Sequence, residues 1–206
     1  MVVALVVALV IVDVAARVAV ERIAERELAR NPELQVEGAD AQIRSFPFVG
    51  RLLVSGETSF TVTLEGVVEQ GVRIDEFSVD IDGLVLDRRG VVDGRVQINS
   101  IAEAEVRLLF TQESVSDLAG VDVAFEPGQA TIVGLPGSPS AGTQVAGGNL
   151  VLSVEGTPVG AMAIPSTTFL PCEPSVEIIE GAVQLSCRTD TLPAVVNDAL
   201  GRVTAP

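Results

Sequence analysis

Residues 42–53 read QIRSFPFVGRLL, and the interpretation of the whole chain depends on this stretch. It places two phenylalanines and several aliphatic side chains around a proline and a glycine, which are residues typical of turns. Exposing so many apolar groups at a turn is unfavourable. They are therefore buried in the core, face a membrane, or line a site that holds apolar cargo.

The composition indicates one domain with an aliphatic interior. The chain has 206 residues, of which 48% are hydrophobic, and its aromatic residues are seven phenylalanines. At about 150 residues per domain, a second domain is not expected. The many valines and isoleucines favour β-strands. We expect residues 13–206 to form a single domain.

The chain lacks His, Lys, Tyr and Trp, and its net charge is −15. The imidazole, amine and phenol groups that usually transfer protons in enzymes are therefore absent. The negative charge repels nucleic acids and also disfavours electrostatic adhesion to anionic lipid, except through apolar contact or a local Arg patch. We expect no enzymatic activity, no cofactor, no bound metal and no nucleic-acid partner.

Residues 1–12 are almost wholly apolar. A helix of this length covers about 18 Å, whereas a bilayer core is roughly 30 Å thick. The segment resembles the apolar region of a signal peptide, although it lacks preceding positive charges and a small-residue cleavage site. We expect the true start to lie upstream and the chain to be exported to the periplasm or cell envelope, with this segment cleaved or kept as a membrane anchor. A buried helix in a cytoplasmic protein is the alternative.

The spacing of apolar residues predicts a long helix followed by an antiparallel sheet. Ala16, Val20, Ile23, Ala24 and Leu28 recur at helical steps, and the helix should end near Asn31-Pro32. Alternation with a period of two predicts strands over residues 58–64, 72–81, 96–98 and 102–110. The residues expected on the inner face of the sheet are Phe60, Val62, Leu64, Phe77, Val79, Ile81, Val106, Leu108 and Phe110.

Two details shape this sheet. The apolar phase changes between Ile74 and Phe77, which predicts a β-bulge at Asp75-Glu76. A short turn at Asp87 to Gly90 would connect neighbouring strands. We therefore expect one antiparallel sheet, strongly bent, packed around the N-terminal helix.

The C-terminal half continues with short elements. Thr111 to Leu118 predicts a capped helical segment that Gly120 ends. Residues 134–148 are rich in Gly, Pro, Ser and Thr and predict a mobile loop. Strands are expected to resume at Leu150 and Val159, and a final amphipathic helix is expected over residues 192–203.

Cys172 and Cys187 are the only cysteines. Without a histidine, they can neither complete a zinc site of the Cys₂His₂ type nor form a Cys-His catalytic pair. In an exported protein we expect them to form a disulfide. A pair of buried free thiols is the alternative.

Acidic pairs are the remaining candidates for chemistry. Asp80 and Asp82 could suggest a calcium site, but the following residues supply no further ligands, and solvated carboxylates on a strand explain them better. Glu103 and Glu105 have the residue type of glycosidase carboxylates, yet they too fit the solvent face of a strand. We expect Asp80 and Asp82 to bind no metal, and Glu103 and Glu105 not to be catalytic.

The apolar N-terminus, the Ala/Arg/Glu helix and the stretch QIRSFPFVGRLL together resemble the actinobacterial LmeA-like phospholipid-binding family over roughly residues 13–110. The resemblance implies an α+β, tubular lipid-binding (BPI-like) fold, in which a strongly curved antiparallel sheet wraps a long N-terminal helix around an acyl-chain tunnel. It implies that the inner-face residues line the tunnel and that Phe46, Pro47, Phe48, Val49, Leu52 and Leu53 surround its mouth.

Two alternatives remain for this turn and its flanks. The apolar turn could instead be a plug that closes the core. Arg44 and Arg51 flank it and are candidates for binding a lipid phosphate, because a guanidinium group can donate two parallel hydrogen bonds to phosphate oxygens. Ordinary surface arginines are the alternative.

The function that the resemblance implies is non-catalytic binding, with transfer, of phospholipid or a mannosylated phospholipid in the cell envelope. The first alternative is a structural or adaptor protein of the envelope, with a fully packed core and a protein partner. The second is an accessory factor that presents lipid to a glycosyltransferase.

Overall fold

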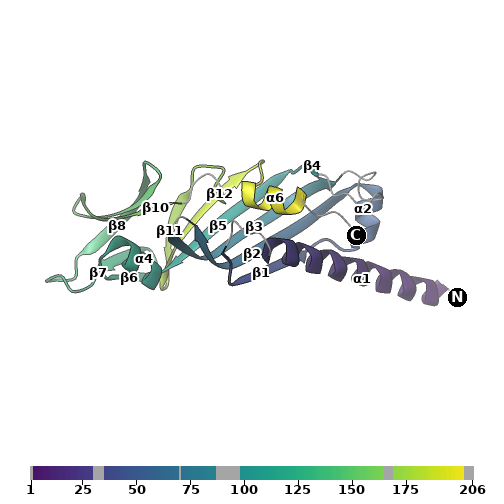
Figure 1. Ribbon diagram of the computed structural model, residues 1–206, viewed down its shortest axis with the longest axis horizontal. Coiled ribbons are helices and arrows are strands. Elements are labelled where there is room, and N and C mark those ends of the chain that lie inside the picture. Colours follow the sequence, from purple (N-terminus) through teal and green to yellow (C-terminus); the bar gives the residue numbers. More distant parts are fainter. Residues whose placement is uncertain (1, 30–34, 70, 87–97, 165–168, 202–206) are drawn as a thin grey trace.

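A computed structural model describes residues 2–29, 35–69, 71–86, 98–164 and 169–201. The protein is α+β, with a long N-terminal helix and two antiparallel sheets. The two sheets follow one another along the long axis of the molecule, and helix α1 runs beside the larger sheet and projects past it (Figure 1). The sequence predicted one sheet, so this part of the prediction is wrong.

The larger sheet has seven strands in the order β1-β2-β3-β5-β12-β11, with β4 paired to β3. Its strands are β1 (Gly38–Ile43), β2 (Glu57–Glu69), β3 (Val72–Leu86), β4 (Ile98–Ser100), β5 (Glu103–Thr111), β11 (Ser175–Ile179) and β12 (Ala182–Thr189). All nine residues predicted on the inner face are buried, each with at most 4% of its surface exposed. The alternation of apolar and polar residues predicts this face correctly because successive side chains of a strand point to opposite faces.

The predicted bulge at Asp75-Glu76 is wrong, although the buried face does change phase there. Glu65 pairs with Glu76 and Val67 pairs with Ile74, so both strands hold the same number of residues across the change. The irregularity lies between Thr58 and Phe60 instead, where the β2–β3 register shifts. On β3 it coincides with Gly83, whose positive φ of 62° is one that glycine adopts without strain.

Helix α1 (Val2–Ala29) begins eleven residues before the predicted start at Asp13. No proline or glycine separates the apolar segment from the charged one, so a single helix continues through both. Ala24 and Leu28 are buried as predicted, but Val20 is exposed. None of the helices within the described ranges has the length and apolarity needed to cross a membrane.

The smaller sheet has five strands in the order β10-β9-β8-β7-β6. They are β6 (Val123–Glu126), β7 (Gln129–Ile132), β8 (Ser140–Ala146), β9 (Asn149–Val154) and β10 (Thr157–Ala163). The mobile loop predicted over residues 134–148 is therefore partly wrong, because β8 occupies its second half. Gly147 and Gly148 both have positive φ and form the two-residue turn between β8 and β9, a geometry that suits a tight hairpin.

The described residues also include the shorter helices α2 (Phe48–Val54), α4 (Gln112–Ala119) and α6 (Ala194–Gly201). Helix α4 has the predicted cap, since the Thr111 hydroxyl accepts a hydrogen bond from the backbone N–H of Ser114 and Gly120 is left-handed. Helix α6 begins two residues after the start of the predicted range, and residues 202 and 203 of that range lie outside the described residues. The predicted turn at residues 87–90 and Val96 lie outside the described residues.

Both edges of the larger sheet have neighbours. Helix α1 lies against β1 at one edge. At the other edge, the N–H of Gly128 donates to the carbonyl of Ile178 in β11 at 2.9 Å, which links β11 to the smaller sheet. Cys172 and Cys187 form the predicted disulfide, with their Cα atoms 6.0 Å apart.

Candidate functional site

The turn before α2 separates its two phenylalanines. Phe46 is 63% exposed, whereas Phe48, at the first position of α2, is only 5% exposed and belongs to the core. Val49 and Leu52 are partly buried, Pro47 is exposed, and the side chain of Leu53 lies outside the described part of the chain. The segment is thus divided: Phe48 fits the prediction of a plug, and Phe46 fits the prediction of an exposed rim.

Helix α2 is held at its N-terminus by a carboxylate from α1. The backbone N–H groups of Phe48 and Val49 donate to Asp13 at 3.1 and 2.7 Å. Pro47, which occupies the N-cap position, supplies no side-chain acceptor of its own. Asp13 is 5% exposed, so it caps α2 within the protein interior. A carboxylate at this position also interacts favourably with the positive end of the helix dipole.

A second carboxylate of α1 holds the edge strand β1. Glu21 accepts a hydrogen bond from the backbone N–H of Ile43 at 2.8 Å and another from Arg17, also at 2.8 Å. Arg17 and Glu21 have the i,i+4 spacing that favours an ion pair on a helix. The long-range contacts of Asp13 and Glu21 were missed, because a sequence does not show which helix face meets which strand.

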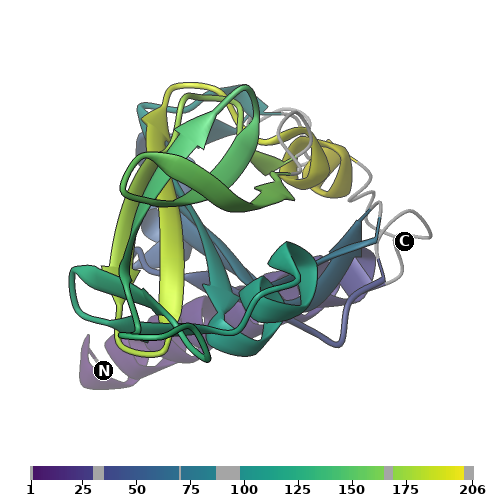
Figure 2. The same ribbon diagram turned by 90° about the vertical axis from the view of Figure 1, so that its left-hand side faces the viewer.

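The predicted tunnel lining forms part of a continuous apolar core. Its nine residues share one cluster with Ala24 and Leu28 of α1, Phe48 of α2, and Val195 and Val196 of α6. The ring of Phe77 meets that of Phe169 edge to face, with centroids 4.9 Å apart. Viewed along the long axis, α1, the larger sheet and α6 surround this common interior (Figure 2).

The two headgroup candidates lie in different surroundings. Arg44 forms ion pairs with Asp80 and Asp82 at 3.5 and 3.3 Å, on the outer face of the larger sheet. Arg51 is exposed on α2, and no ion-pair partner for it lies within the described ranges. The guanidinium group of Arg44 is therefore already paired with carboxylates, whereas Arg51 has no such partner in the described part of the chain.

The acidic pairs face arginines on the outer face of the sheet. Asp80 accepts a hydrogen bond from the Thr61 hydroxyl at 2.7 Å and is paired with Arg107. Glu103 and Glu105 lie 3.6 and 3.8 Å from Arg188. These contacts give the carboxylates a role in holding neighbouring strands together.

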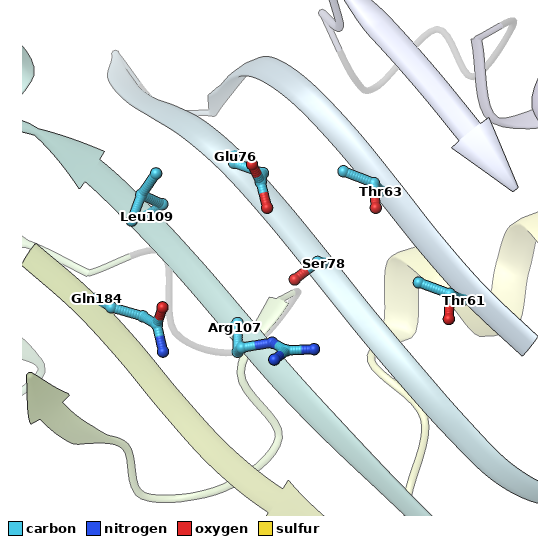
Figure 3. A pocket seen from close by; sticks show the side chains of 7 residues that line it. All are labelled: Thr61, Thr63, Glu76, Ser78, Arg107, Leu109 and Gln184. Atoms are coloured by element: carbon cyan, nitrogen blue, oxygen red, sulfur yellow. The ribbon is translucent and has the colours of Figure 1, made fainter. Parts of the chain in front are cut away.

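The outer face also contains a polar hollow of about 330 Å³, which sequence reasoning did not identify. Figure 3 shows the side chains that surround it, contributed by β2, β3, β5 and β12: Thr61, Thr63, Glu76, Ser78, Arg107, Leu109 and Gln184. Alternation placed these residues on the solvent face, but the register that aligns four strands was needed to bring them together.

One exposed pair beside this sheet has a perturbed ionisation. Arg73 donates two hydrogen bonds to Glu37, at 2.9 and 3.0 Å. The hydrogen bond from Arg73 and its positive charge lower the pKa of the Glu37 carboxyl below its usual value. The same contact raises the pKa of Arg73. The pair links β3 to the start of β1, far from the α2 turn.

Comparison with known proteins identifies the family. No curated protein and no solved structure matches the chain significantly. A family model described as LmeA-like phospholipid-binding matches residues 11–204, which extends well beyond the region where the sequence resemblance was recognised. It covers α1 from Ile11, both sheets and α6. The chain therefore belongs to the LmeA-like phospholipid-binding family.

Proposed function

We propose that this protein binds phospholipid without altering it chemically, in the periplasm or cell envelope of the cell. The observation that carries the proposal is the family match over residues 11–204. The lipid is a phospholipid or a mannosylated derivative, and residues 13–206 act as one binding unit. Binding serves transfer of the lipid, or its presentation to a glycosyltransferase. Export, with the N-terminal segment cleaved or kept as an anchor, is part of the same proposal.

The acyl chains are proposed to lie against the inner face of the larger sheet. In this proposal the sheet is the curved wall of a tubular, BPI-like domain. Moving one CH₂ group from water to such a face contributes about 0.8 kcal/mol, so a long acyl chain outweighs any single headgroup contact. Arg51 is the better placed headgroup candidate, because Arg44 already pairs with two carboxylates.

The inner face is already covered by helices, so an acyl chain must displace one of them. We assign this movement to α2. The helix has seven residues, and its N-terminus is held by the two hydrogen bonds to Asp13. Phe48 would leave the core as α2 moves, while Phe46 stays at the entrance. The buried Phe48 then closes the site when no lipid is present.

Native mass spectrometry of gently purified protein tests the proposal. The expected result is a folded protein that carries added mass equal to one or more phospholipids. After delipidation, the protein should take up a fluorescent phospholipid, and Phe46→Ala should reduce the uptake. A folded protein that neither retains lipid nor takes it up would contradict the proposal.

A second function is favoured by a different observation. Each of the nine inner-face residues is at most 4% exposed, which is also what a fully packed envelope protein with a protein partner would show. Such a protein would bind its partner equally well with or without lipid. Delipidated protein that retains all partner binding would favour this alternative.

A further inference from the structure

Exposed apolar side chains gather at the end of the molecule where α1 passes α2. On α1 they are Val7, Leu9, Val10, Ile11, Val12 and Val14. Phe46, just before α2, is 63% exposed, and Val54, the last residue of α2, is 80% exposed. The hydrogen bonds from Phe48 and Val49 to Asp13 keep these two groups together. We call this set of residues the apolar end, and Figure 1 shows it opposite the smaller sheet.

The apolar end also differs from the rest of the chain in charge. The whole chain has 28 acidic residues and 13 basic ones. In this region Arg17 pairs with Glu21, and Arg44 pairs with Asp80 and Asp82, so Arg51 is the arginine that keeps an uncompensated charge within the described residues. Asp13 is buried against α2, and Arg51 is exposed. An anionic surface is therefore repelled by most of the molecule but not by this end.

The distribution of exposure around α1 indicates the kind of partner. All six residues from Val7 to Val12 are exposed, so every side of the helix is apolar and uncovered there. A groove on a protein partner would cover one stripe of a helix. A lipid interface can instead surround the whole circumference, because acyl chains and headgroups adapt to its shape.

We infer that the apolar end, in the protein that keeps its N-terminal segment, docks on a phospholipid bilayer that contains anionic lipid, with Phe46 and residues 7–14 of α1 in the interface and Arg51 at the headgroups. This inference rests on the proposed function, since a phospholipid-binding protein must meet the membrane that supplies or receives its lipid. Docking here would hold the α2 turn, the proposed entrance, at the bilayer surface.

A single introduced tryptophan can report the docking, because the chain contains neither Trp nor Tyr. Phe46→Trp should show a blue-shifted emission and strong quenching by brominated acyl chains when mixed with phosphatidylglycerol–phosphatidylcholine vesicles. The matched control is Leu135→Trp. Leu135 is 48% exposed, in the turn between β7 and β8 at the opposite end of the molecule. Its emission should not change.

Charge substitutions give a second measurement. The variant Leu9→Asp/Ile11→Asp should lose at least tenfold in vesicle partitioning, because two exposed apolar residues no longer enter the interface. Arg51→Gln should lose about fivefold on phosphatidylglycerol vesicles and little on pure phosphatidylcholine. The control Val133→Asp/Leu135→Asp changes two apolar residues that are each 48% exposed, compared with 62% and 61% for Leu9 and Ile11, and it should partition like the wild type. All of these residues are at the surface, so thermal melting temperatures should be unchanged.

Several outcomes would overturn the inference. Equal quenching at positions 46 and 135, or equal partitioning of the two double-aspartate variants, would show that the apolar end does not dock. Self-association of the wild type that Leu9→Asp/Ile11→Asp abolishes, without vesicle binding, would assign this end to a second copy of the chain. Uptake of a soluble short-chain fluorescent phospholipid separates the two proposals: if uptake persists without vesicle docking, only the docking inference fails.

Discussion

Asp13→Ala should destabilise the protein by releasing the N-terminus of α2. The substitution leaves the N–H groups of Phe48 and Val49, now 3.1 and 2.7 Å from the carboxylate, without an acceptor. A hydrogen bond to a charged group contributes about 1.5 to 3 kcal/mol and loss of a helix N-cap costs about 1 kcal/mol. The two bonds share one carboxylate, and removing it also relieves the cost of burying its charge. We therefore expect a net loss of about 2 to 4 kcal/mol.

For a chain of this size, a loss of 3 kcal/mol lowers the melting temperature by about 6 to 12 °C. Asp13→Asn should fall between the variant and the wild type, because one amide oxygen remains to accept a hydrogen bond. Circular dichroism gives the melting temperature, and hydrogen exchange at residues 48 and 49 reports α2 directly. The control is Asp40→Ala, since Asp40 is exposed and its carboxylate accepts from Gln42. Unchanged melting together with unchanged exchange at α2 would refute the capping role of Asp13.

Four further predictions concern other parts of the molecule. Phe48→Ala should lower the free energy of unfolding by about 3 to 5 kcal/mol because its ring is buried, whereas Phe46→Ala should change it by less than about 1 kcal/mol. Urea unfolding measures both values. Similar losses in the two variants would contradict the assignment of Phe48 to the core and Phe46 to the surface. Replacing Cys172 and Cys187 by Ser should cost about 3 kcal/mol on the chain-entropy model, and unreduced wild-type protein should resist alkylation; two labelled thiols would exclude the disulfide. Glu103→Gln/Glu105→Gln should leave phospholipid uptake intact, and a large loss in the folded variant would show that these carboxylates take part in lipid binding. Arg73 lowers the pKa of Glu37, so the pair stabilises the protein above the unfolded pKa of about 4.3 and loses this contribution as pH falls through the lower folded pKa. The small difference in melting temperature between wild type and Arg73→Gln should therefore shrink as the pH falls below about 4.3.

The inner face of the larger sheet could be predicted from the sequence because its signal is local. Val62 and Leu64 alternate with threonines, and this period of two already assigns them to one face. The signal for the cap of α4 is equally local, because Thr111 lies three residues before Ser114, whose N–H donates to its hydroxyl. These features depend on neighbouring residues, so pattern alone was enough.

The features that escaped prediction depend on contacts between distant residues. Asp13 and Phe48 are 35 residues apart, and nothing in either segment shows that one caps the other. Strand β8 has the composition of a loop, and it is a strand because β7 and β9 pair with it on both sides. The opposite exposures of Phe46 and Phe48 follow from where α2 begins, which that distant cap helps to determine.

The position of α1 along β1 has a consequence for solubility. A strand at a sheet edge presents unpaired N–H and C=O groups, which can recruit a strand from another molecule and start aggregation. Here α1 lies along the β1 edge, and Glu21 accepts a hydrogen bond from the N–H of Ile43. At the opposite edge, the carbonyl of Ile178 in β11 accepts a hydrogen bond from the N–H of Gly128. In a chain that is 48% hydrophobic, this shielding matters. A truncation that removes α1 would uncover β1 and leave an edge that can act as a template for intermolecular β-sheet.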